Sequence, residues 1–214
     1  HGFDEGAHAK KIAAHLGTDH HELYLSGREA LDMIPRLPEI YDEPFADISA
    51  VPTCLVAQFA RRDVTVALSG DGGDEMLGGY SRHLEAPKIW NAVRHMPRPL
   101  RRVAQTMLKR LSPQHWERLL KSVPQAGGRV HKALSLLSMN SEEEIYRSLL
   151  EQWPEPPVLS GKNVRTLFDD TQYRSQGLSF AEKMMYWDAL SYLPDDILVK
   201  VARAGMAASL QTRA

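Results

Sequence analysis

The sequence predicts an α/β domain built on a parallel sheet, with a largely helical second half. Three observations predict this class. Helical and strand-like segments alternate along residues 1–86, which is the element order of an α/β fold. The β-branched, apolar run at 64–69 suits a parallel strand buried on both faces. Proline and glycine then divide the rest of the chain into helices, because both residues interrupt or end them.

The first expected elements are a helix and a strand. Apolar residues recur at helical spacing over residues 7–16, which predicts a helix there. Gly17 follows the last apolar position and is expected to end the helix, as glycine does just past a C-terminus. Residues 20–25 alternate between polar and apolar side chains, so we expect a short strand.

The next elements lead to the buried strand. Apolar spacing predicts a helix over residues 31–37, ended near Pro35 and Pro38. Residues 51–61 form an apolar helix with proline in its first turn, where proline is tolerated. The strand at 64–69 follows and runs directly into a glycine-rich acidic turn.

The helical half carries its own start signals. Ser141 and Glu144 have the spacing of a capping box at the start of a helix over residues 141–151. Residues 153–178 are rich in proline and read as a looser segment. A last helical region is expected over residues 179–208.

Composition excludes several classes of protein. With 214 residues and 43% hydrophobic content, the chain is large enough for a real core. Its formal net charge of −1 gives no general signal for nucleic acid or membrane. The single cysteine, Cys54, cannot form an internal disulfide, which favours a cytosolic protein. Its position in an apolar helix predicts that it packs in the core. No apolar run approaches the ~20 residues of a membrane span.

The acidic turn carries the chemistry. The strand delivers Ser69 and Gly70 to the carboxyl edge of the sheet, where open α/β sheets bind ligands. Glycine amides can approach phosphate closely. Asp71, Asp74 and Glu75 would repel bare phosphate, but Mg²⁺ binds one or two carboxylates together with phosphate oxygens. The segment therefore predicts a magnesium–nucleotide site.

Two other interpretations of the acidic turn remain open at this point. It could be a surface turn of solvated acids, which is the commoner origin of a single Asp-Gly-Gly-Asp. A Ca²⁺ loop is a further reading, but the EF-hand spacing is absent. The preceding strand favours the nucleotide site.

Four ordered motifs resemble the asparagine synthetases. The stretch SGDGGDEMLGGY is similar to their acidic signature, and it is the most specific of the four. The other three are GFDEGAHAKKIAAHLGTDHHELYLS, LPEIYDEPFADISAVPT and YLPDDILVKVARAGMAASLQTR. The resemblance covers residues 1–83 and 192–214 well, and residues 88–178 only as a helical region.

The resemblance implies a fold and a reaction. The fold is the adenine nucleotide alpha-hydrolase-like fold of the ATP pyrophosphatases (the HUP type), expected here incomplete at both ends. The implied division is an α/β nucleotide-binding part at 1–86, a helical insertion at 87–178 and a C-terminal helical part at 179–214. The implied enzyme is an ATP-dependent carbon–nitrogen ligase: the aspartate side-chain carboxylate is adenylated, and ammonia then gives asparagine, AMP and pyrophosphate.

The resemblance also implies site residues, carried over position by position. Ser69, Gly70 and Gly72 contact ATP. Asp71 is a catalytic residue, as base or charge organiser, and Asp74 holds Mg²⁺. Arg203 neutralises the departing pyrophosphate, with Lys200 a weaker candidate for the same anion. His1 falls near the strand that abuts adenine.

The sequence departs from the family pattern at three positions. Ala202 stands where the family usually has Asp, Gly205 where it has Ser, and Gln211 where it has Glu. The phosphate loop Ser-Gly-Gly-x-Asp-Ser does not occur in the 214 residues and is expected to precede residue 1. We therefore expect this chain by itself to be inactive.

The resemblance implies partners as well. These are ATP, Mg²⁺, aspartate and ammonia, the last delivered from glutamine by an N-terminal glutaminase domain outside this chain. A cytoplasmic protein is expected, without membrane association, and a homodimer is left open. Two alternatives remain: a related adenylating amidotransferase or β-lactam synthetase-like enzyme, and a nucleotide- or RNA-binding module without activity.

Two smaller groups carry alternatives of their own. By resemblance, the loop with Asp42, Glu43, Asp47 and Ser49 faces the aspartate pocket; otherwise its Asp and Ser cap the following helix. His20 and His21 would point to opposite faces of a strand, so a shared metal is not expected.

A basic segment supports a separate hypothesis. Residues 88–132 hold eleven Lys or Arg against one acid, Glu117, a formal charge of about +10. A solvated helical face that pairs with the acidic remainder explains this best. RNA binding is the alternative, although no nucleic-acid partner is expected overall. Arg101 and Arg102 are the pair whose replacement would test it.

Overall fold

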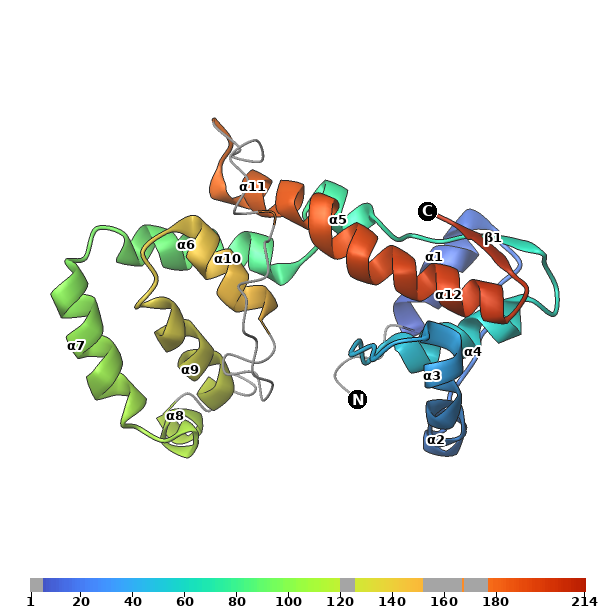
Figure 1. Cartoon of the computed structure of the whole chain (residues 1–214), viewed down its shortest axis with the longest axis horizontal. Coiled ribbons are helices and arrows are strands. Elements are labelled where there is room, and N and C mark those ends of the chain that lie inside the picture. Colours follow the sequence, from blue (N-terminus) through green and yellow to red (C-terminus); the bar gives the residue numbers. More distant parts are fainter. Residues whose placement is uncertain (1–5, 120–125, 152–166, 168–176) are drawn as a thin grey trace. The chain divides into compact units, whose positions relative to one another are not determined.

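The computed structural model describes residues 6–119, 126–151, 167 and 177–214 (Figure 1). The chain forms two compact units, one of residues 1–69 with 198–214 and one of residues 70–197. His1 and most of the looser segment at 153–178 lie outside the described residues. Among the described helices, none has both the length and the apolar character needed to cross a bilayer.

In residues 6–69 and 198–214, the first unit combines six helical elements with two strands (Figure 1). They are α1 (Gly6–Leu16), α2 (Gly27–Met33), η1 (Ile34–Arg36), α3 (Leu37–Tyr41), α4 (Ala50–Ala60), β1 (Val66–Leu68), α12 (Leu198–Ala207) and β2 (Gln211–Arg213).

The second unit is helical in its described residues. Its elements are α5 (Gly73–Leu77), α6 (Ser81–Val93), α7 (Arg98–Lys109), α8 (Pro113–Leu119), α9 (Ala126–Leu136), α10 (Glu142–Leu150), α11 (Phe180–Trp187) and the π-helix η4 (Asp188–Ile197).

The N-terminal helices follow the sequence signals, but the predicted strand does not. Helix α1 ends before Gly17, whose φ of 66° is the left-handed conformation expected of a terminating glycine. Helix α2 begins with a complete capping box between Ser26 and Glu29. Residues 20–25 form no strand, and the prediction was wrong there. Alternation alone cannot make a strand, because a strand also needs a neighbour for its backbone groups.

The described sheet is small and parallel. Strand β1 pairs with β2, and Val66 lies opposite Gln211 while Leu68 lies opposite Arg213. This confirms a helix-rich α/β chain with a parallel sheet. The expectation of a strand buried on both faces was wrong, because Val66 is 47% exposed and Leu68 is 83% exposed. In the part of the chain that is described, the sheet has no further strand or covering layer.

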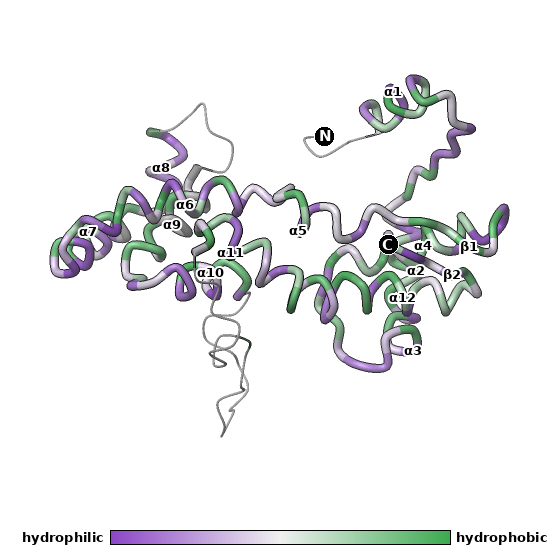
Figure 2. The backbone as a smooth tube through the Cα atoms, turned by 90° about the horizontal axis from the view of Figure 1, so that it is seen from above, coloured by the Kyte–Doolittle hydropathy of each residue, from purple (hydrophilic) through white to green (hydrophobic). Residues whose placement is uncertain are grey.

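The core of the first unit lies where α12 packs on α4 and α3 (Figure 1). Helix α4 is apolar around most of its circumference, as Figure 2 shows by the green that predominates along it. Its Cys54 is 2% exposed, which confirms that the thiol packs in the core. The other buried apolar members are Met33, Tyr41, Ala50, Ala57, Ala204 and Leu210.

The second unit has its own core, formed mainly by α6, α10 and α11. Its buried residues are Ala86, Leu136, Ile145, Tyr146, Phe180, Met184 and Trp187. Ser141 starts α10 and accepts a hydrogen bond from the amide of Glu144, but the carboxylate of Glu144 accepts from the amide of Asn140. The predicted capping box is therefore only half formed.

The helical region predicted over 179–208 is present, with an irregular centre. Ser179 and Glu182 form a complete capping box at the start of α11. The π-helix η4 then contains Pro194, which has no amide hydrogen to donate to the preceding turn. A wider π-type turn is one way in which a helix continues past such a break.

Candidate functional site

Two glycines shape the acidic turn, which we define as residues 69–80. Gly72 has a φ of 89° and precedes α5, and Gly78 has a φ of 72° and ends it. Any other residue would adopt these left-handed conformations at a cost in free energy. At Gly79 a Cβ atom would overlap the carboxylate of Asp74, so this backbone lies directly against the acid. The glycine spacing thus folds the segment into one short helical turn with its acids on the first half.

The three carboxylates of the acidic turn differ in their surroundings. Glu75 is 2% exposed and accepts a hydrogen bond from the hydroxyl of Tyr80. Burial, reinforced by this carboxylate, raises the pKa of the Tyr80 phenol. Asp71 is half-buried and Asp74 is exposed. Within the described residues, neither of these two carboxylates accepts a hydrogen bond, so they are the acids available to a ligand.

The donor set suits magnesium held jointly with a nucleotide. No group of three or more potential metal-ligating side chains occurs in the described part of the chain. Mg²⁺ commonly uses one or two protein carboxylates and takes its remaining ligands from phosphate and water. Asp71 and Asp74 meet that requirement, whereas an all-protein cage would need more ligands than the acidic turn supplies.

The predicted nucleotide contacts fall on both sides of the boundary between the units. Ser69 belongs to the first unit, where its amide and its hydroxyl both donate to the backbone oxygen of Arg213, at 2.7 and 3.3 Å. Gly70, Asp71, Gly72 and Asp74 belong to the second unit. No atom lies within 4 Å of a Cβ built at Gly70, so its backbone is open to approach.

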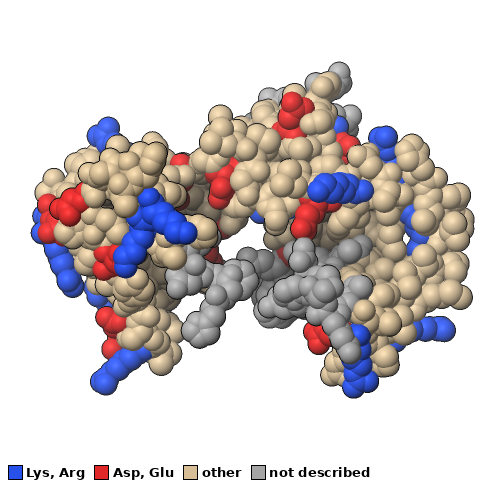
Figure 3. Space-filling view, turned by 180° about the vertical axis from the view of Figure 1, so that it is seen from behind, with Lys and Arg blue, Asp and Glu red and all other residues tan. Residues whose placement is uncertain are grey.

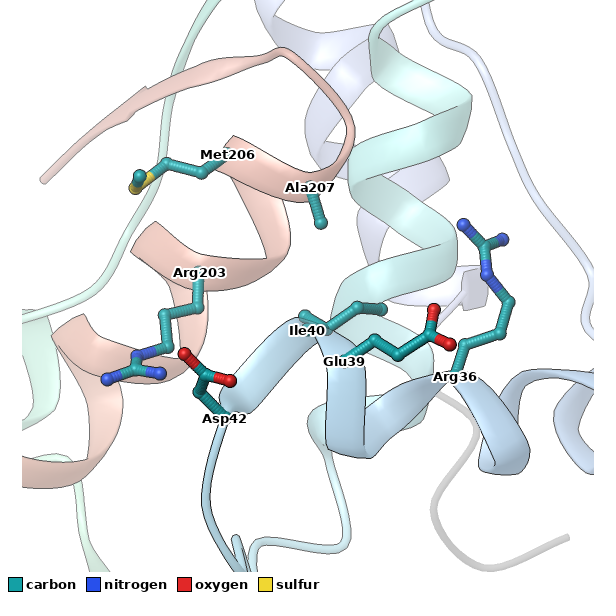
Figure 4. Close-up of a pocket in the computed structure, with 7 residues that line it drawn as sticks. All are labelled: Arg36, Glu39, Ile40, Asp42, Arg203, Met206 and Ala207. Carbon is teal, nitrogen blue, oxygen red and sulfur yellow. The ribbon is translucent and has the colours of Figure 1, made fainter.

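The predicted anion ligand Arg203 lines a cavity of about 640 Å³ in the first unit (Figure 4). Its guanidinium donates to the backbone oxygen of Tyr41 at the end of α3 and lies 3.9 Å from the Glu43 carboxylate. Figure 4 shows the guanidinium beside the carboxylate of Asp42. The full lining is Arg36, Glu39, Ile40, Asp42, Arg203, Met206 and Ala207, so it combines two arginines and two carboxylates with apolar side chains.

A buried ion pair beside this cavity was not anticipated from the sequence. The ammonium of Lys200 donates to Asp47 at 2.6 Å and to the hydroxyl of Ser49 at 2.7 Å. Burial alone would raise the pKa of Asp47, but the hydrogen bonds from Lys200 and Ser49 outweigh it and hold the pKa below its usual value. The available signal was a lysine within the apolar run ILVKVARA, because a lysine in such a run needs a partner when it is buried.

These contacts modify the expectation that Asp47 and Ser49 cap the following helix. Ser49 does occupy the N-cap position of α4, but its side chain makes no capping hydrogen bond. Its hydroxyl instead donates to Asp47 at 2.7 Å and accepts from Lys200. The loop is therefore fastened to α12 rather than only to the helix that follows it.

One departure from the family pattern has a structural explanation. At Gly205 a Cβ atom would lie 2.9 Å from the backbone oxygen of Leu210 and 2.9 Å from the Thr212 methyl group. The return from α12 into β2 therefore approaches the helix too closely for a serine. Gln211 begins β2, where its amide donates to the oxygen of Thr65. Nothing in the structure explains alanine at position 202.

Among the side chains that the structure describes, the basic segment is not uniformly exposed. Arg101 is 6% exposed and donates to the oxygen of Met139, so it is part of the packing between α7 and α9. Arg98, Arg102 and Arg110 are exposed. On the face drawn in Figure 3, Lys and Arg side chains lie in separate groups divided by uncharged surface. Figure 2 shows hydrophilic and hydrophobic residues interspersed along α7.

Comparisons with known proteins agree with the motif resemblance. The chain is 34% identical over 207 residues to a protein of Methanocaldococcus jannaschii provisionally named asparagine synthetase 2, glutamine-hydrolyzing, covering 95% of this chain and 38% of that protein. It is 30% identical over 220 residues to asparagine synthetase 1, glutamine-hydrolyzing, of Bacillus subtilis, covering 99% and 32%. It is 34% identical over 82 residues to asparagine synthetase B, glutamine-hydrolyzing, of Escherichia coli, covering 37% and 15%.

The chain spans about a third of the length of the first two relatives. No solved structure matches it. The family model for asparagine synthase matches residues 1–214, which is the whole chain. The protein therefore belongs to the asparagine synthase family.

Proposed function

We propose that this chain is the synthetase part of a glutamine-hydrolysing asparagine synthetase. The reaction is ATP-dependent adenylation of the aspartate side-chain carboxylate, followed by amidation with ammonia derived from glutamine. The products are asparagine, AMP and pyrophosphate. The observation that carries the proposal is the acidic turn. Among the described residues, Asp71 and Asp74 have no hydrogen-bond partner for their carboxylates and lie near open glycine backbone, while Glu75 is buried and accepts a hydrogen bond from Tyr80. Family membership over residues 1–214 supports it.

Each proposed site residue has a chemical role that suits its surroundings. Ser69, Gly70 and Gly72 approach the ATP phosphates, which open backbone at Gly70 allows. The exposed Asp74 holds Mg²⁺, which would supply positive charge to the phosphates. The half-buried Asp71 acts as base or charge organiser for the aspartate carboxylate and ammonia.

Arg203 completes the proposed set on the pyrophosphate side. Its guanidinium is 38% exposed although one nitrogen already bonds to the Tyr41 oxygen. An arginine that is oriented by one hydrogen bond and lies at the outer limit of an ion pair with Glu43, at 3.9 Å, is suited to stabilise an anion that develops during reaction. This role is proposed from the family resemblance and from the open cavity that Arg203 lines.

The wider architecture is part of the same proposal. We infer a HUP-type, ATP pyrophosphatase sheet for residues 1–86, a helical insertion at 87–178 and a C-terminal part at 179–214. A glutaminase domain would supply the ammonia, and the enzyme would work in the cytoplasm, with a homodimer left open. The names of the relatives as glutamine-hydrolyzing support the ammonia source.

The direct test uses the full-length enzyme with ATP, Mg²⁺, glutamine and a panel of carboxylic acids. We expect AMP and asparagine in equal amounts when aspartate is supplied. Asp71→Asn and Asp74→Asn should each lower the rate about a hundredfold or more, because each removes a charge acting at the reacting groups. The control Asp63→Asn changes an exposed acid of a turn in the first unit and should leave the rate unchanged.

The three departures from the family pattern favour a second candidate function. Loss of Asp, Ser and Glu at positions 202, 205 and 211 removes polar groups near the proposed pyrophosphate side. A related adenylating enzyme would release AMP with another carboxylic acid and give no asparagine. That outcome of the panel would replace the leading proposal. AMP release with none of the acids would favour a nucleotide-binding module.

A further inference from the structure

We propose that Lys200 is a positioning residue for the Arg203 cavity and not a ligand of the pyrophosphate. The inference rests on the proposed function, because that function gives Arg203 its anion. It assigns Lys200 a different task from the one its position in the motif suggests. Lys200 and Arg203 lie one turn apart on α12, and each binds a different end of the loop at residues 42–49.

The ammonium of Lys200 is already committed inside the first unit. Lys200 is 7% exposed, and its Nζ donates to Oδ2 of Asp47 and to Oγ of Ser49. The other oxygen of Asp47 accepts from the amide and the hydroxyl of Ser49, both at 2.7 Å. A buried ammonium whose bonds are met in this way would lose them by turning to an external anion, and that loss is costly.

Tyr41 links this ion pair to Arg203. Its ring stacks on Phe45 of the loop, with centroids 4.5 Å apart and planes 3° from parallel. Its hydroxyl donates to the backbone oxygen of Lys200 at 3.4 Å, and its own backbone oxygen accepts from Arg203. Tyr41 stands between Ile40 and Asp42, which both line the cavity. The loop is thus fixed by Arg203 and Tyr41 where it starts and by Lys200 where it ends.

Loss of the Lys200 ammonium would leave Asp47 charged and poorly solvated. We expect the loop to move toward water, because an unpaired carboxylate that is only 14% exposed is unfavourable. The movement would shift Asp42, which lines the cavity, and Glu43, whose carboxylate lies 3.9 Å from the Arg203 guanidinium. We therefore expect removal of Lys200 to disturb the cavity through the loop.

The test compares Lys200→Met, Asp47→Asn and the double variant Asp47→Asn/Lys200→Met in the full-length enzyme. The control Lys183→Met removes an ion pair of similar length to Glu142 in the second unit, at 2.7 Å. Two experiments are carried out on each variant. The first measures hydrogen exchange in peptides covering residues 42–50, and the second measures KM and kcat for pyrophosphate in ATP–pyrophosphate exchange.

In Lys200→Met we expect faster hydrogen exchange at residues 42–50, unchanged exchange at β1, and a KM for pyrophosphate raised about tenfold or more. Asp47→Asn should raise the same KM although it leaves Lys200 in place. The double variant should regain stability but keep the raised KM. Lys183→Met should change none of these. If the double variant restores the wild-type KM, a fixed loop is unnecessary and the proposal is overturned.

A direct contact between Lys200 and the anion would give a different pattern. In that case Lys200→Met would raise the KM with normal hydrogen exchange at 42–50, and Asp47→Asn would leave the KM unchanged. If the wild-type enzyme shows no ATP–pyrophosphate exchange, the proposed function fails. Hydrogen exchange at 42–50 then decides the inference by itself, and unchanged protection in a folded Lys200→Met would overturn it.

Discussion

His83 and Asp188 form a hydrogen-bonded pair that is almost excluded from solvent. The imidazole Nε2 lies 2.6 Å from Oδ2 of Asp188, and the two side chains are 2% and 0% exposed. Asp188 also accepts from Arg82 at 2.9 Å and from the hydroxyl of Tyr146 at 2.8 Å. One carboxylate at the start of η4 therefore joins α6 and α10, and the second unit depends on its charge.

Asp188→Asn should destabilise the protein by about 3 kcal/mol, because it leaves the half-buried Arg82 and the buried His83 without their carboxylate partner. The change in the free energy of unfolding would be measured by chemical denaturation, with the fluorescence of the second unit as the signal. The control Asp195→Asn changes an exposed acid on the same helix and should stay within about 0.5 kcal/mol of wild type. Equal effects of the two substitutions would contradict a role for the buried charge.

Gly205→Ser should destabilise the protein by about 1–3 kcal/mol, although serine is the usual residue of the family at this position. The cause is the 2.9 Å approach of a Cβ atom to the Leu210 oxygen. Thermal unfolding provides the measurement. Gly128→Ser in α9, where a Cβ meets nothing within 4 Å, is the matched control and should be neutral or slightly stabilising. A stabilised Gly205→Ser would show that the return into β2 can move.

Asp47 should make stability depend on pH in the acid range. Its pKa is held below the usual value in the folded protein, so its contribution is complete above the unfolded-state pKa of about 4. The contribution is lost as the pH falls through the lower folded-state pKa. The free energies of unfolding of wild type and Asp47→Asn should therefore differ at pH 7 and converge toward pH 3. A constant difference would mean that the charge of Asp47 is not responsible.

Ser179→Ala should cost about 1 kcal/mol by removing the N-cap of α11. The amide of residue 179 still donates to the Glu182 carboxylate in this variant, so only the hydroxyl's share in lowering the pKa of Glu182 is lost. Circular dichroism during denaturation would measure this loss of stability. Ser81→Ala changes an exposed serine that begins α6 but is not its cap, and it should be close to neutral.

Arg101→Ala and Arg102→Ala should differ although both remove one positive charge from α7. Arg101 is buried and donates to the Met139 oxygen, so its loss should cost about 1.5–3 kcal/mol. Arg102 is exposed, and its loss should be near neutral. An RNA-binding test should therefore replace Arg98 and Arg102, because reduced binding by Arg101→Ala would report unfolding. Equal stability of the two variants would show that the Arg101 bond is dispensable.

Local signals in the sequence predicted local structure well. Gly17 and Ser141 mark helix ends as expected, because each acts on backbone groups within a few residues of itself. The parallel pairing of the strand at 64–69 was also expected. Its burial was not, since burial depends on neighbours that β-branched composition cannot specify.

Long-range pairs among the candidate site residues were beyond the sequence. Lys200 and Asp47 lie far apart in the sequence, and no motif around either residue indicates that they pair. The acidic turn was predictable because its glycines and acids are contiguous. The sequence could not predict which of its acids would be buried, because the contact of Glu75 with Tyr80 depends on how α5 packs. Arg203 was placed by resemblance, and only the structure reveals its bond to Tyr41.

Cys54 is a native reporter of the transient separation of α4 and α12 in the first unit. It is the sole cysteine of the 214 residues, it is 2% exposed, and burial raises the pKa of its thiol. Thiol-specific reagents attack the thiolate, which is both scarce and inaccessible while α4 and α12 stay packed. The rate of alkylation at this one sulfur would then follow the transient separation of those helices, with no label engineered into the protein.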